Sequence, residues 1–295
     1  MTEVQSNTGV GRPLPVPTRE ELPPLLARTP LAIIDEALTF LRINPALFFG
    51  LTTAVVIPLQ LLILVLPGSS LRGNRPDRTA DIIFGSLDQP GAVANGIGTL
   101  VFESLSLFVV ATIFGQLAAS WYSGESMSTS QLLRASVKRI PKAIGAWTVA
   151  HFFILTAGIF TFGTMGVLVG TFFIVAAPVM GAEDLGIGES LKRSRVLATS
   201  KLGHSLIMYV IVAVAGLVID SAVRLAPTFI LSQVDIPAWI SNGVFDVVAS
   251  IIVVSFTAAT SVVLYLDLRV RREGIDLYMA VDQKFRPSRI GGSRG

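Results

Sequence analysis

Residues 186–206 read GIGESLKRSRVLATSKLGHSL and lead directly into the apolar run IMYVIVAVAGLVI at 207–219. A short polar segment with a basic flank is thus followed by a bend and by a stretch with the composition of a membrane helix. Two weaker copies lie upstream, AIIDEALTFLRINPALFFG at 32–50 and STSQLLRASVKRIPKAIGA at 128–146. Each copy predicts a polar interfacial helix, an interruption and a membrane span.

The interruptions are the second feature that the copies share. The residue before a proline avoids the α region, so a helix usually ends there. We therefore predict helix breaks at Pro45, at Pro141 and at Thr199 and Ser200. The result is a three-fold repeat, in which three amphipathic interfacial helices lead into the first, third and fifth spans.

The composition indicates that lipid is the main solvent of this chain. Of 295 residues, 52% are hydrophobic and only 15% are charged, whereas soluble domains carry about 25% charged residues. There is no cysteine, which excludes disulfides and thiolate sites. The net charge of +3 is small and no basic cluster with aromatic residues occurs, so we predict no nucleic-acid partner.

Six apolar stretches are long enough to cross a hydrocarbon core of about 30 Å. The apolar run from 142 to 181 would extend about 60 Å as one helix, so it must contain two spans. The predicted fold is an all-α integral membrane protein with six transmembrane helices and three interfacial helices. The spans are expected at 46–66, 98–122, 143–161, 164–181, 203–225 and 243–266.

The chain divides into three parts by composition. Residues 1–28 are polar and rich in proline, which predicts a disordered cytoplasmic tail. Residues 29–278 form the six-span membrane domain, and 279–295 form a basic cytoplasmic tail. Thr29 and Pro30 are expected to be the N-cap and the first residue of the first polar helix.

The distribution of basic residues predicts the orientation. Of the 23 Lys and Arg residues, all but Arg72, Arg75, Arg78 and Arg224 lie on the side of the polar helices and the termini. Cytoplasmic loops carry the excess of Lys and Arg. We therefore expect a multi-pass location with both termini in the cytoplasm and loop 67–97 outside.

Ionisable residues inside predicted spans are costly and therefore mark candidate sites. Glu103, Asp220, Arg224 and Asp246 all fall in the outer third of the bilayer, and the spacing of Asp220 and Arg224 suits an i,i+4 pair. One hypothesis is an outward-open polar pocket between the second, fifth and sixth spans that receives a cation, a proton or a lipid headgroup. The alternative is that all four side chains reach the outer headgroups or cap helix ends.

Basic side chains near the inner headgroups form a second candidate set, for binding anionic lipid. The alternative is that they only fix the topology. The set comprises Arg134, Lys138, Arg139, Lys192, Arg193, Arg195, Arg269, Arg271 and Arg272.

Catalytic signatures are absent from the sequence. There is no phosphate loop of the GK[ST] type, no HExxH and no GxSxG motif, and Gly186-x-Gly188 lacks the third glycine of a dinucleotide loop. His151 and His204 are isolated from any metal-binding pattern. We predict no catalytic residue, no metal site and no cofactor.

Three segments carry a resemblance to a known family: YLDLRVRREGIDL at 265–277, GESLKRSRVL at 188–197 and EALTFLRINP at 36–45. Read on its own, the first predicts a helix end, with Asp267 paired to Arg271 at i+4 and Gly274 as the left-handed C-terminal residue. Over residues 30–280 the chain resembles a group of actinobacterial six-helix membrane proteins. That group is named after the membrane domain of glycerophosphoryl diester phosphodiesterases.

The phosphodiesterase chemistry of that family belongs to a separate soluble barrel domain, which these 295 residues do not contain. The resemblance therefore implies an integral protein of the bacterial plasma membrane, multi-pass, beside envelope-assembly machinery. We expect a non-enzymatic scaffold or accessory subunit, with the lipid bilayer, anionic lipids and other membrane proteins as partners. The alternative is a transporter or lipid-handling protein with an outward-facing polar pocket, because repeated units are common in transporters. An intramembrane enzyme ranks third, since no nucleophile–base pair occurs.

Overall fold

The described part of the chain is all-α and contains no strand. The computed structural model describes residues 14, 17, 21–22, 26–63, 90–230 and 238–274, without the side chains of 63, 90–97, 99, 224–230 and 238–243. The predicted tail 279–295 and most of loop 67–97 lie outside these residues.

Six helical segments within the described residues are long and apolar enough to cross a membrane, as the sequence predicts. The chain is thus a candidate multi-pass membrane protein. The segments are Pro45–Leu62, Leu100–Ser123, Thr129–Phe160, Thr164–Glu183, Leu202–Val223 and Val244–Glu273.

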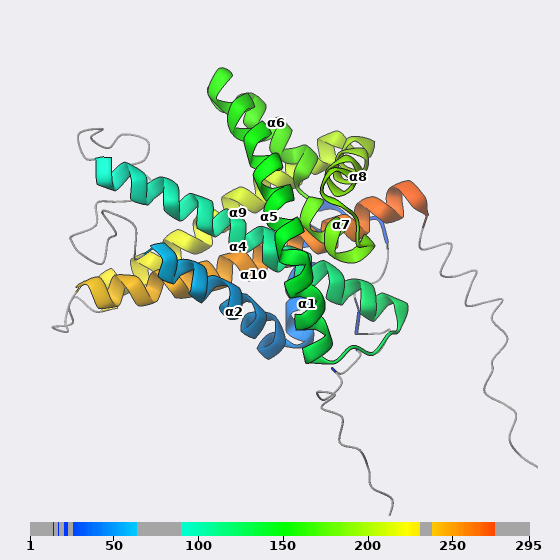
Figure 1. Cartoon of the computed structure of the whole chain (residues 1–295), viewed down its shortest axis with the longest axis horizontal. Helices are drawn as coiled ribbons and strands as arrows, with labels where there is room; N and C mark the ends of the chain where they lie inside the picture. The colour runs from blue at the N-terminus through cyan, green and yellow to red at the C-terminus, as the bar shows by residue number, and fades with distance from the viewer. Residues whose placement is uncertain are drawn as a thin grey trace, which may run out of the picture.

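Helix α10 (Ala238–Glu273) is the central element of the bundle (Figure 1). It contacts α2 (Pro45–Ile63), α4 (Pro90–Ser123) and α9 (Leu202–Ile230), which run along it. We call the end where α2 and α9 finish and α4 and α10 begin the loop end. The opposite end, where α10 finishes beside α8 (Ile187–Ser200), is the polar end.

Helices α5 (Thr129–Phe160) and α6 (Thr164–Phe173) form a hairpin that is inclined to the other long helices. Its tip projects away from the bundle at the top of Figure 1. The turn lies where the sequence predicts it, and both Phe162 (φ 51°) and Gly163 (φ 90°) adopt left-handed conformations there. Phe162 is fully exposed, which suits a hairpin tip in contact with lipid.

Two of the three predicted helix breaks are confirmed. Helix α1 (Pro30–Ile43), with Thr29 as its N-cap, ends two residues before Pro45, and α8 ends at Ser200 before α9 begins. Each of these copies has a short helix of 14 residues, a one-residue break and a long helix.

The predicted break at Pro141 is wrong, because α5 continues through it without interruption. Pro141 is exposed, while Ser136 before it and Ala143 and Ala146 after it are buried. One continuous face of α5 packs against α4 and α8. This packing offsets the loss of the backbone hydrogen bond that proline cannot make. The second polar helix and the third span are therefore one element.

The fourth predicted span, 164–181, is interrupted, unlike α5. It consists of α6 and of α7 (Ala176–Glu183), which packs tightly along α4. A Cβ at Gly181 would lie 1.9 Å from the Thr112 carbonyl oxygen, and one at Gly115 would lie 2.6 Å from the Pro178 carbonyl oxygen. Glycine at both positions therefore lets the two backbones touch.

Aromatic rings hold α1, α2 and α4 together near the polar end. The ring centroids of Phe40 and Phe48 are 4.8 Å apart, and those of Phe48 and Phe114 are 4.7 Å apart. Part of the segment predicted as a disordered tail packs beside them. The Leu14 N–H donates to the Met127 carbonyl at 2.9 Å, and Leu22 is buried.

Candidate functional site: a cavity between five helices

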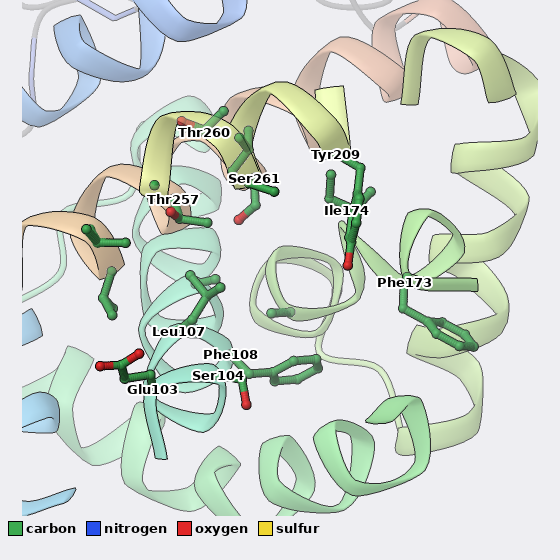
Figure 2. Close-up of a pocket in the computed structure, with 18 of the residues that line it drawn as sticks. Glu103, Ser104, Leu107, Phe108, Phe173, Ile174, Tyr209, Thr257, Thr260 and Ser261 are labelled. Atoms are coloured by element: carbon green, nitrogen blue, oxygen red, sulfur yellow. The ribbon is translucent and has the colours of Figure 1, made fainter. Parts of the chain in front are cut away.

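A cavity of about 660 Å³ lies between α4, α5, α6, α9 and α10, and Ala177 of α7 also lines it (Figure 2). Each of these helices contacts the next around the ring, in the order α4, α10, α9, α6 and α5, and α5 returns to α4. The volume lies within the range of about 300–1,000 Å³ that is typical of small-molecule sites. The cavity is lined by segments that the sequence predicts to lie inside the bilayer.

The cavity walls are mainly apolar, with hydroxyl groups at intervals. Tyr209 from α9 and Ser261 from α10 point into the space between the helices (Figure 2). A Cβ at residue 170 would lie 2.7 Å from the Tyr209 hydroxyl oxygen, so Gly170 of α6 makes room for that ring. The other lining hydroxyls are those of Ser104, Ser250, Thr257 and Thr260.

A polar relay crosses three helices on the side of the cavity nearer the loop end. The Gln60 amide of α2 donates to Ser250 Oγ of α10 at 3.0 Å, and Ser250 Oγ donates to Glu103 Oε1 of α4 at 3.4 Å. Ser250 is buried and Glu103 is half-buried. The relay therefore fixes the position of the Glu103 carboxylate at the cavity wall.

The structure brings together part of the predicted polar pocket. Glu103 and Asp220 both line the cavity, on α4 and α9. Asp246 is buried one helical turn before Ser250 but does not line the cavity. The side chain of Arg224 is outside the described residues, so its predicted pair with Asp220 stays a prediction. The walls include α5 and α6, which the hypothesis did not include.

Sequence reasoning missed the contribution of α5. Trp147 Nε1 donates to Ser104 Oγ at 3.2 Å, and its ring stacks on His151 with centroids 4.5 Å apart. His151 and Ser104 line the cavity. The only sequence signal was a lone histidine in an apolar span, which indicates a hydrogen bond more often than a ligand site.

At the polar end, arginines predicted to bind anionic lipid form ion pairs within the protein. Arg193 of α8 pairs with Glu183 at 3.0 Å and with Glu273. Arg269 pairs with Glu273 at 3.0 Å, and the Tyr265 hydroxyl donates to Glu183 at 2.9 Å. Burial by itself would lower the pKa of Arg193, but the hydrogen bonds to Glu183 and Glu273 raise it. The cluster holds α7, α8 and α10 together.

A second buried group joins the start of α1 to the end of α10. Asp267 pairs with Arg271 at 2.8 Å, as predicted, and accepts the backbone N–H of Arg28 at 2.6 Å. Arg28 also pairs with Glu36 at 3.2 Å. Gly274 ends α10 with φ 60°, which confirms the predicted helix end.

The remaining basic candidates differ in their partners. Arg139 pairs with Asp184 at 3.2 Å, and Arg272 donates to the Val196 carbonyl. Arg272 is exposed, and so are the four other candidates, Arg134, Lys138, Lys192 and Arg195. For all nine basic residues, anionic-lipid binding stays a prediction.

No family model, curated protein or solved structure matches this chain. Within the described residues, no group of three or more His, Cys, Asp or Glu is placed to hold a metal ion. The functional argument therefore depends on the chain's own geometry: a candidate multi-pass membrane protein with a largely apolar cavity between its helices.

Proposed function

We propose that this protein is a lipid-handling membrane protein that holds one amphiphilic molecule in the cavity between α4, α5, α6, α9 and α10. The cavity is the observation that supports the proposal. Its mainly apolar walls suit a hydrocarbon chain, and its few polar groups suit a head group that fixes the orientation of the ligand.

The distribution of the acidic groups favours a long ligand with a head at one end. On α9 the lining extends from Tyr209 to Asp220, which corresponds to about 16 Å of helix. The carboxylates of Glu103 and Asp220 lie toward the loop end, and the hydroxyl of Tyr209 lies toward the polar end. Because the charge distribution predicts that the loop end faces outward, we expect the ligand to enter from the outer leaflet.

The sequence suggests this lipid-handling function as the alternative to a scaffold. The scaffold interpretation, the absence of enzyme activity and the family resemblance stay predictions. Copurification from native membranes separates the two functions: stable stoichiometric partner proteins favour a scaffold, and a retained lipid favours the cavity.

A cavity-filling variant tests the proposal. Ser261→Phe places a ring in the cavity, whereas Val214→Phe adds the same ring on an exposed position of α9 that does not line it. Native mass spectrometry of protein taken from its own membranes should show a retained lipid in the wild type and in Val214→Phe. We expect this adduct to be lost in Ser261→Phe. Equal retention in all three proteins would contradict the proposal.

A further inference from the structure

We infer that the molecule held in the cavity carries a free hydroxyl group, which the side chains of Tyr209 and His151 bind. The ligand class is therefore a lipid alcohol, whose polar group both donates and accepts a hydrogen bond. This inference rests on the proposed function and specifies its ligand class. It follows from two neutral side chains that offer the cavity one donor and one acceptor.

The ring of His151 offers the acceptor. His151 lines the cavity, and its Nδ1 lies 3.0 Å from the Trp147 carbonyl oxygen. A carbonyl oxygen can only accept, so in the neutral ring Nδ1 carries the proton and Nε2 keeps its lone pair. The indole of Trp147 stacks on the same ring with centroids 4.5 Å apart, which fixes the ring plane. Nε2 has no hydrogen-bond partner among the described residues.

Tyr209 of α9 offers the donor. Its hydroxyl points into the cavity (Figure 2), and its ring rests against the backbone of Gly170. Within the part of the chain that the structure describes, this hydroxyl has no hydrogen-bond partner. The O–H of a tyrosine in an apolar site usually finds one. An oxygen atom of the ligand would supply that partner.

Several of the other lining hydroxyls already donate within the protein. Ser104, Thr260 and Ser261 donate to carbonyl oxygens of their own helices at 3.1, 2.8 and 2.8 Å. Ser250 donates within the polar relay. Their protons are therefore engaged, whereas Tyr209 keeps its proton for a ligand.

The packing of the α5–α6 hairpin brings the donor and the acceptor to one part of the cavity. Gly166 of α6 packs on α5, since a Cβ at that residue would lie 3.2 Å from the Ile154 carbonyl oxygen. In an antiparallel pair, the next turn of α6, at Gly170, then lies beside the preceding turn of α5, which contains His151. Because Tyr209 rests on Gly170, its hydroxyl and the His151 ring border the same space.

Three neutral probes with the same chain test the assignment: a brominated 16-carbon alcohol, its methyl ether and the corresponding alkane. The alcohol donates and accepts, the ether only accepts, and the alkane does neither. The protein is placed in nanodiscs of neutral lipid, and Trp147 reports a bound probe, because bromine quenches tryptophan fluorescence only at short range. Replacing Trp121 and Trp239 by phenylalanine leaves Trp147 as the one tryptophan of the chain.

We expect saturable quenching by all three probes. Half-quenching should occur at about tenfold lower concentration for the alcohol than for the alkane, with the ether between them, because each hydrogen bond contributes about 1 kcal/mol.

Two variants separate the two hydrogen bonds. Tyr209→Phe removes the donor, so the ether should lose its advantage over the alkane. His151→Phe removes the acceptor but keeps a ring beside Trp147, so the alcohol should fall to the level of the ether. Thr148→Val is the control, because it deletes an exposed hydroxyl of α5 that does not line the cavity. All three probes should bind this control as they bind the wild type.

Equal half-quenching by the three probes in the wild type would overturn the hydroxyl assignment and leave the proposed function standing. A preference for the alcohol that survives unchanged in both variants would overturn the assignment too. Absence of saturable quenching by any probe would overturn the proposed function as well.

Discussion

Asp267 illustrates at the residue scale how charge is used inside this bundle. Its side chain has no exposed surface, and it joins α10 to the start of α1 through Arg28 and Arg271. Removing one partner of such a group leaves charges buried without compensation, which costs about 3–5 kcal/mol. The network therefore depends strongly on this one carboxylate.

We predict that Asp267→Ala lowers the free energy of unfolding by about 3–5 kcal/mol, measured by chemical denaturation in detergent micelles. Asp184→Asn is the control, because that side chain is 64% exposed although it pairs with Arg139, and because asparagine tolerates the left-handed backbone of residue 184 (φ 49°). Exposed pairs contribute at most about 1 kcal/mol, so the control should change little. Similar losses in the two variants would show that Asp267 does not anchor the ends of these helices.

At the scale of the element, the sequence predicts the position of the helices well, because composition and length decide which segments enter lipid. The predicted cap of the first polar helix is also confirmed: Thr29 is the N-cap of α1, and its side chain accepts the backbone N–H of Ala32. The prediction failed at Pro141, where packing on both sides of the residue overrides its local preference. A local sequence pattern carries no information about this tertiary packing.

The cavity could be predicted only in part from the sequence. Glu103 and Asp220 stood out because charge inside a span is costly. Ser104 and Tyr209 are ordinary residues for a membrane helix, so nothing in the pattern marked them. They share a cavity only because α5 and α6 lean across the ring, and that inclination is a tertiary feature. For the same reason the pairing of Arg193 with Glu273, far apart in the chain, was not predicted.

The continuity of α5 leads to a prediction about Pro141 itself. Pro141→Ala should restore the missing backbone hydrogen bond in the helix interior and raise the free energy of unfolding by up to about 3 kcal/mol. Pro45→Ala is the matched control, because Pro45 is the first residue of α2, where proline is favoured and its missing N–H has no helical partner. Thermal denaturation followed by circular dichroism measures both. A lower melting temperature for Pro141→Ala would indicate that the proline supports the helix.

At the scale of the whole molecule, the orientation in the membrane is a prediction from charge. Because the chain has no cysteine, single cysteines report topology without background labelling. A cysteine at Ser86, in the predicted outer loop, should react with a membrane-impermeant thiol reagent in intact cells. One at Ser126, between α4 and α5, should react only after the cells are opened. The reverse pattern would invert the topology and place the acids of the cavity on the cytoplasmic side.

Photo-crosslinking from lipid tests most directly the claim that the cavity holds an amphiphile inside the membrane. Cells that express the protein are supplied with lipids that carry a diazirine on the acyl chain and are then irradiated. Mass spectrometry locates the labelled residues. The account predicts labels on lining residues with little exposed surface, such as Ala177 at 6% exposure and Ser261 at 8%. Labels confined to exposed positions such as Phe152 and Ile159 would show that lipid surrounds the bundle without entering it, and would contradict the account.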